Sequence, residues 1–373
     1  MRALLIVLDS LGVGSAPDDL GPPARNTLGQ LFHEVPDLEL PTLFSLGLGE
    51  ILKGRVFDPP ARVCAASYGR MIQRSAGSDA LSALWELAGV ILGCPFSTFE
   101  QLPPEFLRSI AQESGSEFLL NRSNQPALTP ELRKEHLRTG HPILTFDPEG
   151  VLHIAAHEAA MPLARLIQIA RITRRHSDAW RIAQVIAEPF QGDWEPSNHA
   201  LRLSLVPPRT ILNALSDKGL PVEAIGSIND AFAQSGITHA HPTLNRAESL
   251  SIIERLWRAP QNGMVFAHME NSGCAVRFAR ALEEFDRWLG QFLNHIESDD
   301  LILITGSNNG ADRQEVPILV RYGGHTEPLG VRETFADVAA TLGAFFKISE
   351  HGHPWNVGEP LITFHRPRGY NGP

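Results

Sequence analysis

Asp9 is the first side chain of the sequence that stands where many folds carry out chemistry. It follows a short apolar run, Ala3–Leu8, whose Leu, Ile and Val residues predict a buried strand. In open parallel α/β sheets, ligands bind at the carboxyl ends of the strands. The position therefore makes Asp9 a candidate ligand of a metal ion or a neighbour of a phosphate group. The structural alternative is a carboxylate that caps the following helix.

Other residues that could ligate a metal ion lie near further predicted strand ends. His268 closes the apolar run Met264–His268, Glu270 stands just beyond it, and Asp312 precedes another run, Val316–Val320. The remaining histidine candidates are His325 and, in the tail, the pair His351 and His353. None of these residues has a recognised ligand spacing, and a chain with 15 histidines contains such pairs by chance. They are secondary candidates beside Asp9.

The composition excludes several classes of protein. Hydrophobic residues make up 43% and charged residues 20% of the 373 residues, which indicates a globular chain long enough for about two domains. The net charge of −10 argues against general affinity for nucleic acid or anionic lipid. No run approaches the ~18 apolar residues of a membrane helix. Cys64, Cys94 and Cys274 lack the spacing of a zinc site, so we expect three reduced thiols in a soluble, cytoplasmic protein.

Strand and helix patterns alternate towards both ends of the chain. The predicted strands are Ala3–Leu8, Met264–His268, Leu301–Thr305 and Val316–Val320, and the predicted helices are Ala247–Trp257, Ala275–Ile296 and Glu333–Phe346. Strands that alternate with helices at this spacing predict an α/β fold with a mostly parallel sheet flanked by helices.

The middle of the chain has a different pattern, bounded by prolines at Pro95–Pro104 and Pro207-Pro208. Helices are predicted at Glu131–Thr139 and Leu163–Arg174, and strands within Pro142–His153 and at Gln184–Ala187. We therefore expect a core domain formed by residues 1–96 and 208–373, and a smaller inserted α+β domain formed by residues 97–207.

Several motifs of the chain together resemble the bacterial phosphopentomutases of the alkaline phosphatase superfamily. They are Val7–Asp18, Asn26–Gly29, Leu40–Leu43 with Leu46–Gly49, Ile154–Glu158, Pro189-Phe190 with Gly192, Ala224–Gly226 through Gly236–Thr238, Leu282–Asp286 and Arg332–Asp337. The resemblance implies an alkaline-phosphatase-like core that binds two divalent cations, usually manganese, and an inserted cap domain. It also implies interconversion of ribose or deoxyribose 1-phosphate and 5-phosphate through a phosphorylated threonine.

The position of that threonine is occupied by Ala80. Asp79, Trp85 and Glu86 keep the register of the family motif around it. A methyl group cannot accept a phosphoryl group, so covalent catalysis at this position is excluded. Ser82 supplies a hydroxyl two residues later, but successive residues of a helix turn by about 100°, so it points away from Ala80. The structural interpretation is an ordinary helix with Asp79 as its N-cap.

Most of the implied metal ligands are also replaced. The family motif that carries a carboxylate and an imidazole after one strand is represented by Asn308 and Asn309, whose neutral amides bind a hard dication more weakly. The resemblance implies an Asp/His pair of ligands after Met264–His268, and this pair is missing at its usual spacing. It also implies a further histidine ligand before Val316, and Asp312 is among the residues nearest to that position. Of the implied ligands only Asp9 is retained.

The implied contacts to the phosphosugar differ as well. Glu188 stands where the family has an arginine before Pro-Phe, which reverses the charge offered to a phosphate. Ser227 stands where the family commonly has a lysine, whereas His157 and Glu158 are retained and read as structural.

These replacements predict a catalytically inactive relative that binds a protein partner or a small phosphorylated ligand of the sugar or nucleotide type. No cofactor is expected to bind tightly, and manganese is the ion expected if one binds. The alternatives are a phosphopentomutase with an altered metal site, or a different metal-dependent phosphoryl-transfer or hydrolytic enzyme built on Asp9, Ser82 and new histidines. Neither a nucleic-acid nor a membrane partner is expected.

Overall fold

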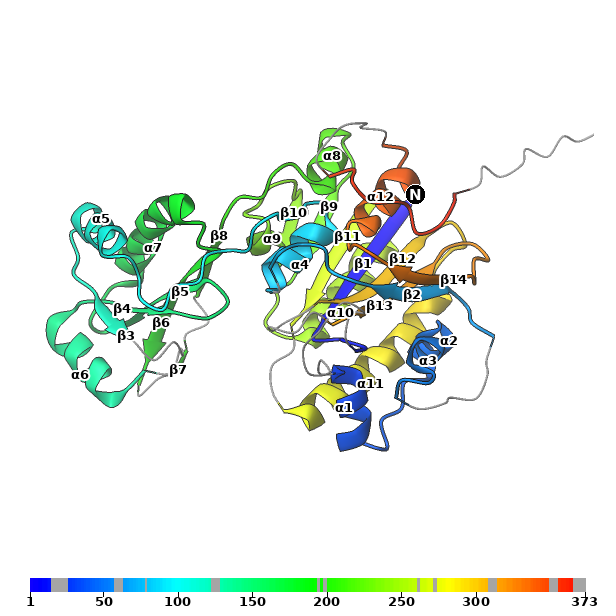
Figure 1. Ribbon diagram of the computed structural model, residues 1–373, viewed down its shortest axis with the longest axis horizontal. Coiled ribbons are helices and arrows are strands. Elements are labelled where there is room, and N and C mark those ends of the chain that lie inside the picture. Colours follow the sequence, from blue (N-terminus) through cyan, green and yellow to red (C-terminus); the bar gives the residue numbers. More distant parts are fainter. Residues whose placement is uncertain are drawn as a thin grey trace, which may run out of the picture. The chain divides into compact units, whose positions relative to one another are not determined.

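A computed structural model of the protein describes residues 1–14, 26–56, 63–77, 79–121, 128–192, 200–259, 262–270, 274–307, 314–348 and 355–364, and the backbone of 195–196. The chain divides into two compact units (Figure 1). The core unit comprises Met1–Gly93, Pro207–Asn229 and Gln234–Pro373, and the insert unit comprises Cys94–Val206 with Asp230–Ala233. That residues 97–207 act as a cap domain stays a prediction.

The core unit contains an eight-stranded sheet with the order β10-β9-β11-β1-β12-β13-β2-β14. Its strands are β1 (Arg2–Asp9), β2 (Ser67–Met71), β9 (Val222–Ile225), β10 (His239–His241), β11 (Gly263–Met269), β12 (Leu301–Ser307), β13 (Val316–Arg321) and β14 (Pro328–Arg332). The central strand β1 is buried along nearly its whole length, as its continuous apolar run predicts. It pairs in parallel with β11 on one side and with β12 on the other.

One strand of this sheet runs against the expected direction. The sequence pattern groups Val316–Val320 with the parallel strands, but β13 pairs antiparallel with both β12 and β2. Only eight residues, 308–315, separate β12 from β13, whereas a parallel crossover needs about a dozen or more. The remaining pairs of neighbours are parallel, so the prediction of a mostly parallel α/β sheet is confirmed.

Helices cover both faces of the core sheet (Figure 1). One face packs against α1 (Thr27–Glu34), α2 (Pro41–Ser45), α3 (Leu48–Leu52), α10 (Arg246–Arg258) and α11 (Ala275–Phe292). The other face carries α4 (Ala80–Leu87), α8 (Ile211–Asp217) and α12 (Asp337–Phe345). Helix α12 begins later than the predicted Glu333, because Thr334 and Phe335 form hydrogen bonds to a buried side chain before the helix starts.

The insert unit has a sheet of its own, with the order β3-β4-β5-β6-β7 and with β8 paired to β6. Its strands are β3 (Leu119–Asn121), β4 (Ile143–Phe146), β5 (Val151–His157), β6 (Gln184–Gln191), β7 (Glu195–Pro196) and β8 (Leu201–Ser204). Helices α5 (Pro104–Ser114) and α7 (Leu163–Ser177) pack their apolar sides on one face, and α6 (Pro130–Thr139) lies by the other. The unit therefore has its own hydrophobic core.

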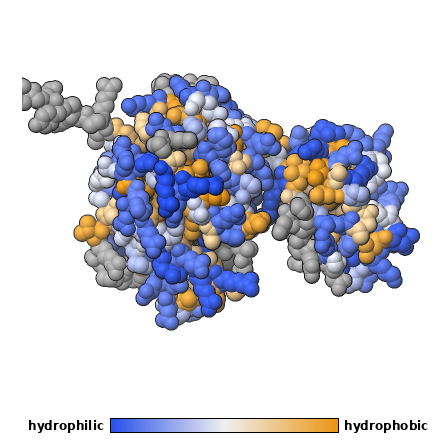
Figure 2. Space-filling view, turned by 180° about the vertical axis from the view of Figure 1, so that it is seen from behind, coloured by the Kyte–Doolittle hydropathy of each residue, from blue (hydrophilic) through white to orange (hydrophobic). Residues whose placement is uncertain are grey.

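The face of the core unit drawn in Figure 2 is largely hydrophilic. Figure 2 shows one face of the molecule, on which hydrophilic residues cover most of the core unit and hydrophobic residues occur in small groups. Among the helices that the structure describes, none has the length and apolar character needed to cross a membrane.

Candidate functional site

Asp9 lies at the carboxyl edge of the core sheet, as predicted. It is the last residue of β1, its neighbour in the sheet is Ser307 of β12, and only 5% of it is exposed. The Ser307 hydroxyl donates a hydrogen bond of 2.8 Å to Oδ1 of Asp9. The chain turns sharply here, since Ser10 has a φ of +61° and a Cβ at Gly306 would approach the Leu11 carbonyl oxygen to 2.7 Å.

His268 and Ser227 meet at the same edge. The Ser227 hydroxyl and Nδ1 of His268 are 2.7 Å apart, and His268 is 6% exposed. Gly226, with a φ of +73°, allows this close approach, because a Cβ there would lie 2.5 Å from the His268 carbonyl oxygen. The sequence indicated these two residues for separate reasons, one as a possible ligand and one as a lost lysine. The fold brings them into contact.

Arg246, which the sequence analysis missed, is the first residue of α10. Its Nε and Nη1 atoms are buried and form no hydrogen bond with any described residue. Burial lowers the pKa of Arg246, and the negative charges of Glu284 and Asp9 act in the opposite direction. An arginine in the first turn of a helix opposes the helix dipole, and this is the sequence signal that could have indicated it.

The described side chains at this edge do not form the two-manganese site that the resemblance implies. They include two carboxylates, Asp9 at the end of β1 and the exposed Glu270 directly after the neighbouring parallel strand β11. The other groups are the Ser307 hydroxyl that bonds to Asp9, the imidazole of His268 with a serine at Nδ1, and the guanidinium of Arg246. In the part of the chain that the structure describes, no three His, Cys, Asp or Glu side chains are grouped to hold a metal ion. Hard dications prefer several anionic oxygen ligands, and a neighbouring guanidinium repels them.

Glu270 lies at the same carboxyl edge as Asp9, because it directly follows β11, and it is exposed. The remaining predicted ligands lie elsewhere or outside the described residues. His325 follows the antiparallel strand β13 and therefore lies at the amino edge of the sheet, where its Nδ1 is 3.2 Å from Glu327. Asn308, Asn309, Asp312, His351 and His353 lie outside the described residues.

The predicted N-cap of α4 is confirmed. Oδ1 of Asp79 accepts a 2.8 Å hydrogen bond from the backbone N–H of Ser82, and Ala80 is the first residue of the helix. The Ser82 hydroxyl donates to the carbonyl oxygen of Asp79 at 2.8 Å and lies 2.9 Å from Nε2 of Gln73, which donates to it. Ser82 is fully buried, so its hydroxyl is enclosed by protein groups rather than presented to a ligand.

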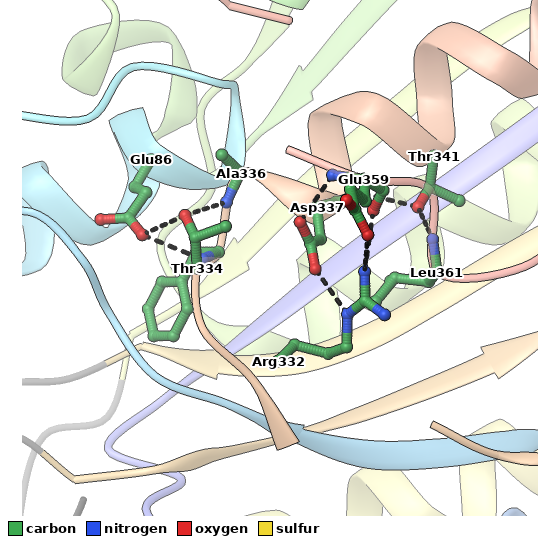
Figure 3. Close-up of polar contacts among 9 residues, drawn as sticks. Glu86, Arg332, Thr334, Ala336, Asp337, Thr341, Glu359 and Leu361 are labelled. Carbon is green, nitrogen blue, oxygen red and sulfur yellow. Dashed lines mark hydrogen bonds and ion pairs between the residues drawn. The ribbon is translucent and has the colours of Figure 1, made fainter. Parts of the chain in front are cut away.

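Glu86, in the same helix, connects α4 to two other segments of the core unit through hydrogen bonds. It is fully buried and accepts hydrogen bonds from the backbone N–H groups of Arg74 (2.8 Å) and Ser75 (2.6 Å). It also accepts from the Thr334 hydroxyl at 2.8 Å and from the Phe335 N–H at 2.9 Å (Figure 3). A buried carboxylate with four donors is well satisfied, which gives Glu86 a structural role in the core unit.

A second carboxylate of the retained motifs has a similar role. Asp337 accepts from Nε of Arg332 at 2.6 Å and from the Glu359 N–H at 2.8 Å (Figure 3). The Thr341 hydroxyl donates to the Asp337 carbonyl oxygen at 2.6 Å and accepts from the Leu361 N–H at 2.9 Å. These bonds attach the described part of the tail to α12.

In the insert unit, Glu188 lies beside His153, which also contacts Asp147. Its Oε1 is 2.8 Å from Nδ1 of His153, and Nε2 of His153 is 3.1 Å from Oδ2 of Asp147. Burial lowers the pKa of His153, but the hydrogen bonds and charges of Asp147 and Glu188 outweigh this and raise the pKa to about 9. The imidazole is therefore protonated at neutral pH. Glu188 is therefore paired with His153, which also pairs with Asp147. Its carboxylate carries a negative charge, whereas the resemblance implies a positively charged arginine at this position.

His157 and Glu158 form contacts within the insert unit. The backbone N–H of His157 donates to Nε2 of His136 at 2.8 Å, and the His157 ring meets the Phe190 ring edge-on at 5.2 Å. Nδ1 of His136 is 2.7 Å from the His141 carbonyl oxygen, and burial lowers the pKa of His136, so this ring is neutral. Glu158 accepts a hydrogen bond from Nε2 of Gln191 at 2.5 Å. These contacts are the kind expected if His157 and Glu158 have a structural role in the insert unit.

Comparison with known proteins finds sequence relatives that are named phosphopentomutases. No protein-family model matches it. A phosphopentomutase of Syntrophotalea carbinolica is 35% identical over 93% of this chain and 95% of its own length. A phosphopentomutase of Acetivibrio thermocellus is 34% identical over 94% of this chain and 97% of its own length. The solved structure of a cofactor-independent phosphoglycerate mutase from Thermoplasma acidophilum covers 87% of this chain and 91% of its own, with a TM-score of 0.36 at 12% identity, a likeness too low to carry an argument. On the identity and coverage of the two sequence relatives, the chain belongs to the phosphopentomutase family.

Proposed function

We propose that this member of the phosphopentomutase family binds a small phosphorylated ligand, of the sugar phosphate or nucleotide type, without transferring its phosphoryl group. The observation that carries the proposal is Ala80 at the start of α4, at the position where the resemblance implies the phosphorylated threonine. A methyl group offers no nucleophile. The nearby Ser82 hydroxyl is fully buried and already bonded to Asp79 and Gln73, so it is a poor substitute.

The charges of the described residues support the same proposal. Phosphoryl transfer by this family is implied to need two cations, and the described residues at the carboxyl edge of the core sheet offer only two carboxylates, Asp9 and the exposed Glu270, with the guanidinium of Arg246 acting on Asp9 through its charge. Glu188 replaces a phosphate-binding arginine and is paired with His153. A binding protein can lose these groups, whereas an enzyme that stabilises a transferring phosphoryl group needs them. The proposal includes that manganese does not bind tightly.

A second candidate function is that of an active phosphopentomutase with an altered site. It is favoured by the identity of 34–35% to proteins of that name, which extends over nearly the full length of both chains. In this case interconversion of ribose 1-phosphate and ribose 5-phosphate proceeds from a nucleophile other than residue 80.

A mutase assay with matched variants separates the two candidates. The purified chain and its Ala80→Thr variant are assayed for conversion of ribose 1-phosphate to ribose 5-phosphate, with manganese or with EDTA. The Syntrophotalea carbinolica phosphopentomutase serves as the active control. We expect no turnover by either form, because the threonine alone does not restore the cations. We also expect calorimetric titration to detect binding of ribose 5-phosphate by the wild type.

Turnover by the wild-type chain contradicts the proposal and establishes the second candidate. Turnover by Ala80→Thr alone contradicts the expectation that the metal site is lost. If neither turnover nor binding of any sugar phosphate or nucleotide is observed, the proposal of a small phosphorylated ligand is wrong. Binding of a protein partner is then the function to test.

A further inference from the structure

Helix α6 of the insert unit is attached to its sheet through a histidine. Among the ten residues of α6, all of which the structure describes, only His136 is buried. Leu132, one turn earlier in the helix, is half-buried against a small apolar cluster. That cluster consists of Leu128, Ile143, Ala155 and Phe190. An imidazole therefore takes the buried position that an apolar side chain normally occupies on the inner face of a helix.

Both nitrogen atoms of the His136 ring are bonded to backbone groups. Nδ1 lies 2.7 Å from the carbonyl oxygen of His141, and Nε2 accepts a hydrogen bond of 2.8 Å from the backbone N–H of His157. A carbonyl oxygen accepts and an N–H donates, so the ring carries its proton on Nδ1 and is neutral. The second of these bonds connects α6 to the last residue of β5.

Protonation of this ring is incompatible with the docked position of α6. An imidazolium carries an N–H group on both nitrogen atoms. The added proton on Nε2 would face the N–H of His157, which would lose its acceptor. His136 is fully buried, and a buried charge without an acceptor is costly. Movement of the ring into water removes this cost.

The neighbouring titratable groups increase the cost of a charge on His136. Burial lowers the pKa of His136, and positive charge on the rings of His157 and His141 lowers it further. On the other side of the ring lies Phe190, with its ring centre 5.9 Å away. Three histidines from α6, from the turn after it and from β5 therefore lie close together. Such clusters are a common basis of pH-sensitive contacts.

The surrounding carboxylates do not neutralise this cluster of histidines. Carboxylates of α6 and of the segments around it are paired with other side chains. They are Glu117 (with His141), Glu135 (with Arg138), Glu158 (with Gln191), and Asp147 and Glu188 (both with His153). The ring of His136 itself is bonded to backbone groups. A proton on His136 thus has no described carboxylate as its partner.

We propose that protonation of His136 releases α6 from the face of the insert sheet at acidic pH, while the rest of the insert unit stays folded. The larger apolar core of the unit lies on the opposite face of the sheet, beneath α5 and α7, and does not include α6. The inference concerns the insert unit alone and does not depend on the proposed function.

The direction of the pH effect follows from the two states of the ring. A released, solvated histidine has a pKa of about 6.5, and the docked ring has a lower pKa. The released state therefore binds more protons, so docking is favoured above about pH 6.5 and weakens as the pH falls below it. One proton changes the ratio of the two states by at most about tenfold per pH unit.

The test is hydrogen exchange of the full chain, followed by mass spectrometry between about pH 7.5 and pH 5, with rates corrected for the intrinsic effect of pH. Peptides from α6 report its release, and peptides from α7 report unfolding of the whole unit. We expect the protection of α6 to fall by up to about tenfold per pH unit below about pH 6.5, while that of α7 stays unchanged. This comparison within the wild type needs no variant.

His136→Gln is the test variant, because its amide offers a donor and an acceptor to the same backbone groups but does not titrate. His141→Gln and His157→Gln are the matched controls. Each removes a neighbouring ring and keeps the backbone group that bonds to His136. We expect the fall in α6 protection to disappear in His136→Gln and to remain in both controls.

The proposal is overturned if α6 keeps its protection in the wild type at about pH 5, or if His136→Gln shows the same fall. Simultaneous loss of protection in α6 and α7 also overturns it, since acid then unfolds the whole unit. Disappearance of the effect in His157→Gln, with persistence in His136→Gln, assigns the titration to His157 and contradicts the role of His136.

A second measurement covers the case in which His136→Gln cannot dock α6 at any pH. NMR of the wild type with labelled histidine rings follows the protonation of His136 directly. We expect the docked ring to keep the signal of a neutral imidazole while the released fraction grows with acidity. A docked His136 that becomes charged would show that α6 tolerates the proton, which contradicts the proposal.

Discussion

Two single side chains support the proposed function, one in each unit. Ala80 stands at the position of the implied nucleophile, and Glu188 stands at the position of an implied arginine. The two positions concern different parts of phosphate chemistry, namely nucleophilic attack and phosphate recognition. The proposal of binding without transfer rests on both.

The charge triad around His153 makes the stability of the protein depend on pH. His153 has a pKa of about 9 in the folded protein, against about 6.5 in an unfolded chain. A raised pKa stabilises the fold fully below pH ~6.5, and this contribution is lost as the pH rises through about 9. We expect wild-type stability to fall by about 2–3 kcal/mol between these limits, measured by denaturant unfolding.

The His153→Gln variant should be less stable than the wild type at pH 6 and should show little of this pH dependence. His33→Gln, which changes an exposed histidine of α1, is the control and should follow the wild-type curve. An unchanged pH profile in His153→Gln would show that the triad does not govern this effect.

At the scale of elements, a carboxylate from one helix caps another. Asp286 of α11 accepts hydrogen bonds from the N–H groups of Thr42 (3.0 Å) and Leu43 (2.7 Å) in the first turn of α2. Asp286 is fully buried, and burial raises its pKa while these two bonds lower it. The motif Leu282–Asp286 therefore joins α11 to α2 through the Asp286 carboxylate.

Removal of this cap should destabilise the core unit without affecting ligand binding. We expect Asp286→Ala to lower the free energy of unfolding by about 2 kcal/mol, because two backbone donors lose their acceptor in a buried place. Arg280→Ala, on the exposed side of the same helix, should change it by less than about 0.5 kcal/mol. Equal stability of Asp286→Ala and the wild type would contradict the capping role.

At the scale of the whole molecule, the chain consists of two units with separate cores. The described residues of the core unit place the carboxyl-edge groups on β1, β9, β11, β12 and α10. The Ser307–Asp9 and Ser227–His268 hydrogen bonds connect them locally. The proposed function predicts that the molecule does not depend on manganese.

Manganese should therefore leave the whole molecule unchanged. After loading with manganese and desalting, elemental mass spectrometry is expected to find no retained ion, and the melting temperature should agree with that in EDTA. A ligand that binds the folded state raises the melting temperature, so the comparison is sensitive to a bound ion. About two ions per chain, with a melting temperature rise that is absent in Asp9→Ala, would establish a metal site.

The local features of this protein follow from residues that are neighbours in the chain. The apolar run before Asp9 predicted the central strand, Asp79 was predicted as the N-cap of α4, and the motifs indicated the family. The substitution at Ala80 is likewise visible without a structure. Each of these features depends on residues that are neighbours in the chain, where strand and helix propensity and capping operate.

Only the tertiary structure decided which distant side chains meet. It placed Arg246 near Asp9, paired Glu188 with His153, and brought Ser227 to His268. It also reversed the expected direction of β13 and moved His325 to the amino edge of the sheet. These arrangements depend on the order of strands in a sheet and on packing between elements far apart in sequence. No local pattern encodes them, because the same strand or helix is compatible with many neighbours.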